Sequence, residues 1–97
     1  MAEIVWSDAK NAELKQRYGF GFERVVVALG EDGLIDERAH PNTLRYGHQR
    51  QLVLLFDDYV WIVPFVADGE SVFLKAMFPS RKATRTYFGD NDRDRKA

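Results

Sequence analysis

Three cationic side chains near the end of the chain have the types and the spacing of a phosphate-binding site. Arg81, Lys82 and Arg85 follow Ser80, which is a favourable N-cap, so a helix is predicted to begin at Arg81. At 100° per residue these three side chains share one side of that helix. A helix N-terminus combined with guanidinium and ammonium groups attracts phosphate. The alternative interpretation is a basic helix face that is only solvated.

The distribution of charge favours a polyanion as partner, although the net charge is −1. Residues 71–89, which include Lys75, contain no Asp or Glu, and neither do residues 38–56. Local field matters more than net charge for binding a polyanion, so the two stretches would form one positive patch if they meet in space. The basic and imidazole side chains of the earlier stretch are Arg38, His40, Arg45, His48 and Arg50.

The two histidines are a poor pattern for a metal site. His40 and His48 stand eight residues apart in a predicted loop, without cysteine or a nearby carboxylate. We therefore predict no metal and no cofactor. General acid or base chemistry suits His40 better, because imidazole titrates near neutrality, and an exposed or capping histidine is the alternative.

Length and composition restrict the chain to one modest domain. A chain of 97 residues can bury a single core. The absence of cysteine excludes disulfides and thiolate chemistry and favours the cytoplasm. We expect neither a membrane span nor a signal peptide, because residues 1–6 lack an apolar region and no apolar run reaches about 18 residues.

The elements that must position these residues are predicted from periodicity and from chain breakers. In the second helix, the spacing i, i+3, i+4, i+7 places Phe22, Val25, Val26 and Leu29 in the core. The pattern as a whole predicts an α+β domain over residues 1–89 and a charged, disordered tail over residues 90–97. The predicted elements are a strand over 3–6, helices over 9–18 and 22–29, a short strand over 34–36, a loop over 38–48, strands over 51–56, 59–66 and 72–78, and a basic helix from Arg81.

The last three strands are predicted to form an antiparallel meander. Asp57-Asp58 is a tight turn, and residues 59–67 are apolar on both faces, which places them in the middle. Pro64 inside this central strand requires a bulge or pairing on one side only. Residues 72–78 are expected to alternate as one strand, and Pro79 is expected to end its ladder because it has no N–H.

Three segments in this order resemble the BrnT family of bacterial toxins, which have a RelE-like ribonuclease fold. Residues 5–11, VWSDAKN, resemble the family's opening W-D-x-x-K, and residues 15–22, KQRYGFGF, are similar to its K-H-G-v-s-F. Residues 78–87, FPSRKATRTY, resemble its final S-A-R-x-A-t-x-x-E-x-x-x-Y. The resemblance covers about residues 3–88.

The chain departs from the family pattern at several positions. Tyr18 stands where the family has a histidine, and Gly21 stands where it has the N-cap serine of the second helix. The R-x-E-x-R motif ahead of the first long strand and the glutamate of the last helix are missing. These departures favour a site of the chain's own within the same fold.

The resemblance implies a ribonuclease toxin of a type II toxin–antitoxin pair that inhibits bacterial growth from the cytoplasm. It would cleave RNA without metal, through attack of the ribose 2′-OH, and a cognate antitoxin, often DNA-binding, would neutralise it. One alternative is a non-catalytic RNA- or protein-binding module on the same scaffold. Another is a structural or regulatory protein without a nucleic-acid role, which the clustered cations disfavour. Exposed apolar strand edges would allow antitoxin contact or a homodimer.

Attack by the 2′-OH needs a base, a stabiliser of the phosphorane charge and an acid. Arg81 is the predicted stabiliser, because a guanidinium grips phosphate oxygens bidentately. Arg50 and Lys75 are candidates for a second clamp. His40 is the candidate acid or base, with Lys10 or Lys15 as substitute, whereas Tyr87 is expected to belong to the core. The residues predicted to contact RNA are Lys10, Lys15, Arg45, Lys82 and Arg85.

Overall fold

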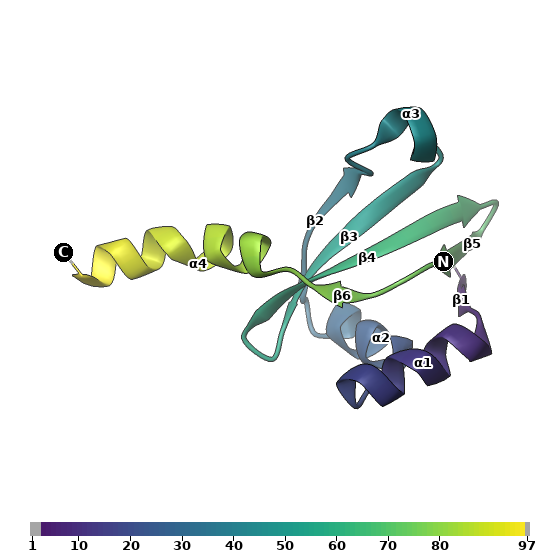
Figure 1. Cartoon of the computed structure of the whole chain (residues 1–97), viewed down its shortest axis with the longest axis horizontal. Helices are drawn as coiled ribbons and strands as arrows, with labels where there is room; N and C mark the ends of the chain where they lie inside the picture. The colour runs from purple at the N-terminus through teal and green to yellow at the C-terminus, as the bar shows by residue number, and fades with distance from the viewer. Residues whose placement is uncertain (1–2, 97) are drawn as a thin grey trace.

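The computed structural model describes residues 3–96, with the side chains of Thr43, Tyr46 and residues 90–96 outside the description. Over this range the chain is an α+β domain built on one six-stranded sheet (Figure 1). The predicted α+β class is therefore confirmed. None of the helices within residues 3–96 is long and apolar enough to cross a membrane.

The first three elements form where local signals predict them. They are β1 (Glu3–Trp6), α1 (Asp8–Tyr18) and α2 (Phe22–Gly30). Ser7 caps α1, since its hydroxyl oxygen accepts the backbone N–H three residues further on at 3.2 Å. Gly19 ends the helix with a φ of 85°, a left-handed conformation that glycine adopts without strain.

A side chain of α1 caps the second helix. The N-cap residue of α2 is Gly21, which has no side chain to accept a hydrogen bond. Instead, the Oδ1 atom of Asn11 accepts the Phe22 N–H at 2.7 Å, and its Nδ2 donates to Glu23 at 2.9 Å. A Cβ atom on Gly21 would lie 2.0 Å from the Asn11 Oδ1. Glycine is therefore required here because Asn11 occupies the place of a capping side chain.

The sheet has the order β1-β5-β4-β3-β2, and β6 pairs with β4 beyond the end of β5. The pairing of β1 with β5 is parallel and the other pairings are antiparallel. The central place of β4 and the meander of β3, β4 and β5 are confirmed. The remaining elements are β2 (Leu34–Ala39), α3 (Thr43–Tyr46), β3 (Gln49–Phe56), β4 (Tyr59–Asp68), β5 (Ser71–Leu74), β6 (Phe78–Pro79) and α4 (Arg81–Lys96).

Pro64 interrupts the last predicted strand. Its carbonyl accepts the Lys75 N–H at 2.8 Å, so its ring nitrogen also faces the β5 side and removes no bond to β3. The prediction of one strand over residues 72–78 is wrong, because β5 ends at Leu74 and β6 begins at Phe78. Three residues there oppose two on β4, which moves Phe78 to the other face of the sheet.

Pro79 does not end the ladder, contrary to the prediction. It pairs with Trp61 within β6, and the next residue, Ser80, donates its N–H to the Val60 carbonyl at 2.9 Å. Since successive N–H groups of a strand point in opposite directions, the Pro79 nitrogen faces away from β4. The missing N–H therefore costs no bond to the central strand.

The region between α2 and β3 is more ordered than the sequence predicts. The strand expected over residues 34–36 extends to Ala39, and the predicted loop over residues 38–48 contains the short helix α3. Pairing with β3 extends β2 to Ala39. The sequence does not predict this extension, because the residues of β2 are all exposed and show no alternation of apolar and polar side chains.

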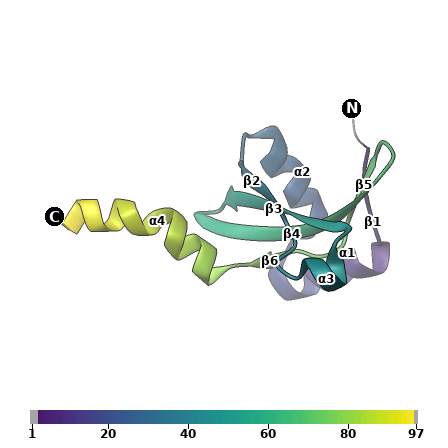
Figure 2. The ribbon, with the colours of Figure 1, turned by 90° about the horizontal axis from the view of Figure 1, so that it is seen from above.

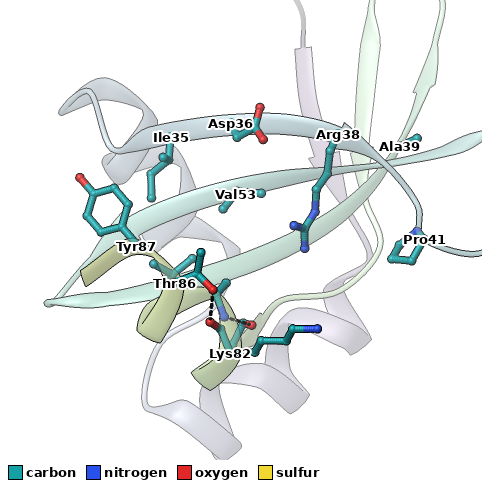
Figure 3. A pocket seen from close by; sticks show the side chains of 12 residues that line it. Ile35, Asp36, Arg38, Ala39, Pro41, Val53, Lys82, Thr86 and Tyr87 are labelled. Carbon is teal, nitrogen blue, oxygen red and sulfur yellow. Dashed lines mark hydrogen bonds between the residues drawn. The ribbon is translucent and has the colours of Figure 1, made fainter. Parts of the chain in front are cut away.

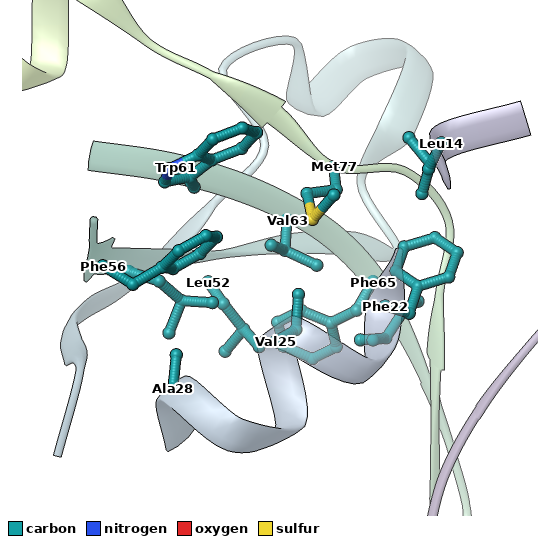
Figure 4. Close-up of a cluster of buried hydrophobic side chains, with 12 residues drawn as sticks. Leu14, Phe22, Val25, Ala28, Leu52, Phe56, Trp61, Val63, Phe65 and Met77 are labelled. Carbon is teal, nitrogen blue, oxygen red and sulfur yellow. The ribbon is translucent and has the colours of Figure 1, made fainter. Parts of the chain in front are cut away.

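Helices α1 and α2 cover one face of the sheet and close the main core (Figure 4). Phe22 and Val25 are fully buried there, as predicted, and Phe56 stacks on Trp61 with ring centroids 5.0 Å apart. The prediction for Val26 is wrong, since 42% of it is exposed. Ala28 takes its place in the core because the face of α2 that meets the sheet is centred further round the helix.

Helix α4 starts on the opposite face of the sheet and then projects away from it, as two views show (Figures 1 and 2). It is longer than the short helix that the sequence predicts. The charged segment of residues 90–97, for which disorder is predicted, continues this helix as far as Lys96. Ala97 lies outside the described residues.

Candidate functional site

A groove of about 540 Å³ lies between β2 and the first turns of α4 (Figure 3). Its floor is apolar, with the nearly buried Val53 and Val60 of the sheet and Ala83 of α4. Arg38 stands on the β2 side and Lys82 on the α4 side. The groove therefore combines an apolar floor with one cationic side chain on each side.

Two hydrogen bonds hold α4 against the sheet and so shape the groove, and a third within its first turn orients the Thr84 hydroxyl. The N–H of Val60 donates to the Thr84 Oγ1 at 2.8 Å, and that hydroxyl donates to the Ser80 carbonyl at 2.7 Å. The Val60 carbonyl in turn accepts the Ser80 N–H. The predicted N-cap is confirmed, because the Ser80 Oγ accepts the Ala83 N–H at 3.0 Å. The hydrogen bonds between β4 and β6 are thus followed directly by bonds from β4 to the first turn of α4.

A buried side chain orients Arg38. In the register of β2 with β3, Arg38 lies opposite Gln51, so both point to the same face of the sheet. Gln51 is only 4% exposed, and its Oε1 accepts the Arg38 Nε–H at 3.1 Å. Figure 3 shows the guanidinium reaching from β2 across the sheet toward the α4 side.

The charged side chains that line the groove are two cations, Arg38 and Lys82, and one carboxylate, Asp36. No described carboxylate lies within ion-pair distance of Arg38 or Lys82 among the side chains that the structure defines. Asp36 also lines the groove, and its Oδ1 accepts the Glu37 N–H at 2.8 Å. Figure 3 draws its carboxylate turned away from the α4 side.

Tyr87 borders the groove and is 43% exposed, so the prediction that it belongs to the core is wrong. Its ring meets Phe88 edge-on at 5.0 Å between centroids, which leaves an aromatic face at the end of the groove. An exposed ring at this place provides a stacking surface.

Of the predicted residues on α4, the groove includes only one. Lys82 lines it, whereas Arg81 and Arg85 are exposed on another side of the helix. The 100° spacing explains the difference, since Lys82 lies nearer round the helix to Ala83 and Thr86, which also line the groove, than either arginine does.

Arg50 lies on the opposite face of the sheet from the groove. It neighbours Gln51 along β3, and adjacent residues of a strand point to opposite faces. Its Nε donates to the Glu37 Oε2 at 2.6 Å, and both side chains are half exposed. The second clamp predicted from Arg50 is therefore not assembled with Lys82.

The lysines of α1 belong to the face of the sheet that α1 and α2 cover. Lys10 lies 3.5 Å from Glu13, and Lys15 lies 3.2 Å from Glu23. The backbone N–H of Glu23, the Asn11 amide and the Lys15 ammonium hold the pKa of Glu23 below its usual range. These lysines take part in local ion pairs and do not line the groove.

The other predicted residues lie in connections and none of them lines the groove. Lys75 stands between β5 and β6 with its ammonium 5.3 Å from the centre of the Phe73 ring. His40 follows β2, and its Nδ1 accepts the Asn42 N–H at 3.0 Å. Arg45 belongs to α3, where its N–H donates to the Asn42 Oδ1.

Within the described residues, no group of three or more His, Asp or Glu side chains lies close enough together to hold a metal ion. The groove residue that the sequence did not assign to the site is Arg38, and the sequence likewise did not indicate its hydrogen-bond partner Gln51. Arg38 stood in the first acid-free stretch, and a polar residue in an otherwise apolar strand was a signal that could have indicated Gln51.

No family model, no curated protein and no solved structure matches this chain. What the structure defines on its own is an α+β domain with an open, positively charged groove on one face of its sheet.

Proposed function

We propose that the groove between β2 and α4 binds single-stranded RNA, and that the protein is a metal-independent ribonuclease toxin of a type II toxin–antitoxin pair. The observation that supports the proposal is the pairing of Arg38 and Lys82 across an apolar floor that ends at an exposed Tyr87. Proteins that bind single strands combine cations along the backbone path with aromatic rings on which bases stack.

The resemblance to BrnT toxins supplies the reaction. In a RelE-like fold, cleavage proceeds by attack of the ribose 2′-OH on the adjacent phosphodiester, so the protein needs charge stabilisation more than a metal. The enzyme would act in the cytoplasm, and a cognate antitoxin, itself a DNA-binding protein, would hold it inactive. The basic groove is the surface such a partner would have to cover.

A second candidate is a non-catalytic RNA-binding module on the same scaffold. The observation that favours it concerns His40, the predicted general acid or base. His40 does not line the groove, and its Nδ1 accepts the Asn42 N–H. Under this alternative the groove binds RNA and no bond is cleaved.

The test is incubation of the purified protein with total RNA in EDTA, with the variants Lys82→Ala and Arg17→Ala in parallel. Arg17 is an exposed cation of α1, on the other side of the sheet, and controls for loss of charge alone. We expect fragments with 2′,3′-cyclic phosphate ends from the wild type and Arg17→Ala, and at least about 100-fold less from Lys82→Ala.

Binding of RNA without fragments would favour the second candidate. Equal cleavage by Lys82→Ala and wild type would refute the groove as the site. Expression of each variant alone then adds a growth measurement, in which the toxin proposal expects arrest by the wild type and by Arg17→Ala only.

A further inference from the structure

We propose that Arg38 is the residue that binds a phosphate of the RNA strand, and that the buried Gln51 is its positioning residue. This inference rests on the proposed function and adds to it, because sequence reasoning assigned the phosphate to Arg81. The geometry favours Arg38, which lines the groove, over Arg81, which is exposed on another side of α4.

The Gln51 contact selects which donors of Arg38 face the groove. A guanidinium has five N–H donors, and the Nε–H is used by the Gln51 Oε1 at 3.1 Å. The four donors on the terminal nitrogens remain, and they form the edge that binds two phosphate oxygens at once. An arginine held at Nε is therefore oriented for a phosphate before the RNA arrives.

The burial of Gln51 makes this orientation firm. Its side chain lies on the same face of the sheet as Val53, two residues further along β3, and only 4% of the residue is exposed. A buried amide cannot exchange its partner for water without cost, so the Arg38 guanidinium loses little further freedom when it binds. On the opposite side of the groove, the Lys82 ammonium adds a positive charge on a flexible side chain and does not fix the orientation of a phosphate.

The Arg38–Gln51 bond could instead serve only the pairing of β2 with β3, and one substitution separates the two roles. Gln51→Glu keeps the shape of the side chain and an oxygen for the Arg38 Nε–H, so strand pairing is retained. It also places a negative charge against the guanidinium, which competes with phosphate. The added charge lowers RNA affinity if phosphate binds at the guanidinium that Gln51 holds, so the proposed role predicts weaker RNA binding by a folded variant. A bond that serves strand pairing alone predicts no change in binding.

The experiment measures affinity for a fluorescein-labelled ten-nucleotide RNA of mixed sequence in EDTA. Its riboses carry 2′-O-methyl groups, which block attack by the 2′-OH and separate binding from cleavage. The proteins are the wild type, Arg38→Ala, Gln51→Glu, Arg81→Ala and the control Arg17→Ala. Urea denaturation of each protein verifies that it is folded and as stable as expected.

We expect roughly tenfold weaker binding for Arg38→Ala, which removes one charge-assisted phosphate contact, and for Gln51→Glu, whose carboxylate competes with phosphate for the Arg38 guanidinium. Loss of one phosphate contact should also reduce the slope of log affinity against log salt by about 0.7. Arg17→Ala should stay within about twofold of the wild type, with an unchanged slope.

The possible failures are distinguishable. Normal binding by Arg38→Ala with weak binding by Arg81→Ala would overturn the inference and leave the RNA proposal intact. Normal binding by Gln51→Glu would overturn the positioning role. A wild type that binds no RNA would overturn the proposed function and this inference together.

Discussion

Replacing Thr84 by valine should loosen α4 from the sheet. The Thr84 hydroxyl accepts the Val60 N–H, which in a regular sheet would bond to a neighbouring strand. It accepts the Val60 N–H at 2.8 Å and donates to the Ser80 carbonyl at 2.7 Å. Valine has nearly the volume of threonine but no hydroxyl. Thr84→Val therefore leaves the Val60 N–H without a partner in a partly buried place.

The size of the effect follows from that unpaired donor. Leaving one buried N–H unsatisfied costs about 1–3 kcal/mol, and we expect a loss in the free energy of unfolding of about 2 kcal/mol. Domains are stable by only about 5–15 kcal/mol. The melting temperature of a domain of this size falls by roughly 4–8 °C per kcal/mol, so a decrease of roughly 10 °C is expected.

The assay is urea and thermal unfolding followed by circular dichroism, with Thr86→Val as the matched control. The Thr86 Oγ1 also donates to the carbonyl four residues back, that of Lys82, at 3.0 Å, but it is exposed and accepts no hydrogen bond from the sheet. Thr86→Val should change the free energy of unfolding by less than about 0.5 kcal/mol. Thr84→Ser keeps the hydroxyl and should retain most of the wild-type stability. Equal losses for the two valine variants would refute the reasoning.

Three further predictions concern the contacts around the helices and the sheet. Asn11→Ala should lower the free energy of unfolding by about 2 kcal/mol in urea titrations, because the buried Phe22 N–H loses its acceptor, and a loss below about 0.5 kcal/mol would contradict this. The lowered pKa of Glu23 means that its stabilising contribution is complete above its ordinary pKa and is lost as the pH falls below about 4, so the stability difference between wild type and Glu23→Gln should shrink there; a pH-independent difference would contradict it. Arg50→Gln should change RNA affinity less than twofold and stability by less than about 1 kcal/mol, because its half-exposed pair with Glu37 lies on the face away from the groove, and a large loss of binding would relocate the site.

Local signals predicted most of the secondary structure correctly. Ser7 and Gly19 mark the ends of α1 because capping depends only on neighbouring backbone groups. Asp57 and Asp58 form the predicted tight turn, with φ values of 55° and 60°, since a two-residue hairpin connection requires that conformation. Such features need no information from distant parts of the chain.

Errors arose where a distant contact overrides the local pattern. The strand predicted over residues 72–78 breaks opposite Pro64 of β4, which has no N–H to donate to it, and the pairing with β4 resumes only at Phe78. The cap of α2 comes from Asn11, ten residues before Gly21, so no rule for local capping could find it. In both cases the deciding partner is far away in sequence.

The candidate site also depends partly on local sequence and partly on contacts between distant residues. Sequence alone determined the charge pattern: two acid-free stretches, a capped basic helix after Ser80, and an α+β order of elements, all of which depend on composition and short-range periodicity. Only the tertiary structure decided which cations meet. The register of β2 against β3 turns Arg38 toward α4 and Arg50 to the other face, because one step along a strand reverses the side chain. The place where α4 meets β4 then brings Lys82, and neither Arg81 nor Arg85, to the groove.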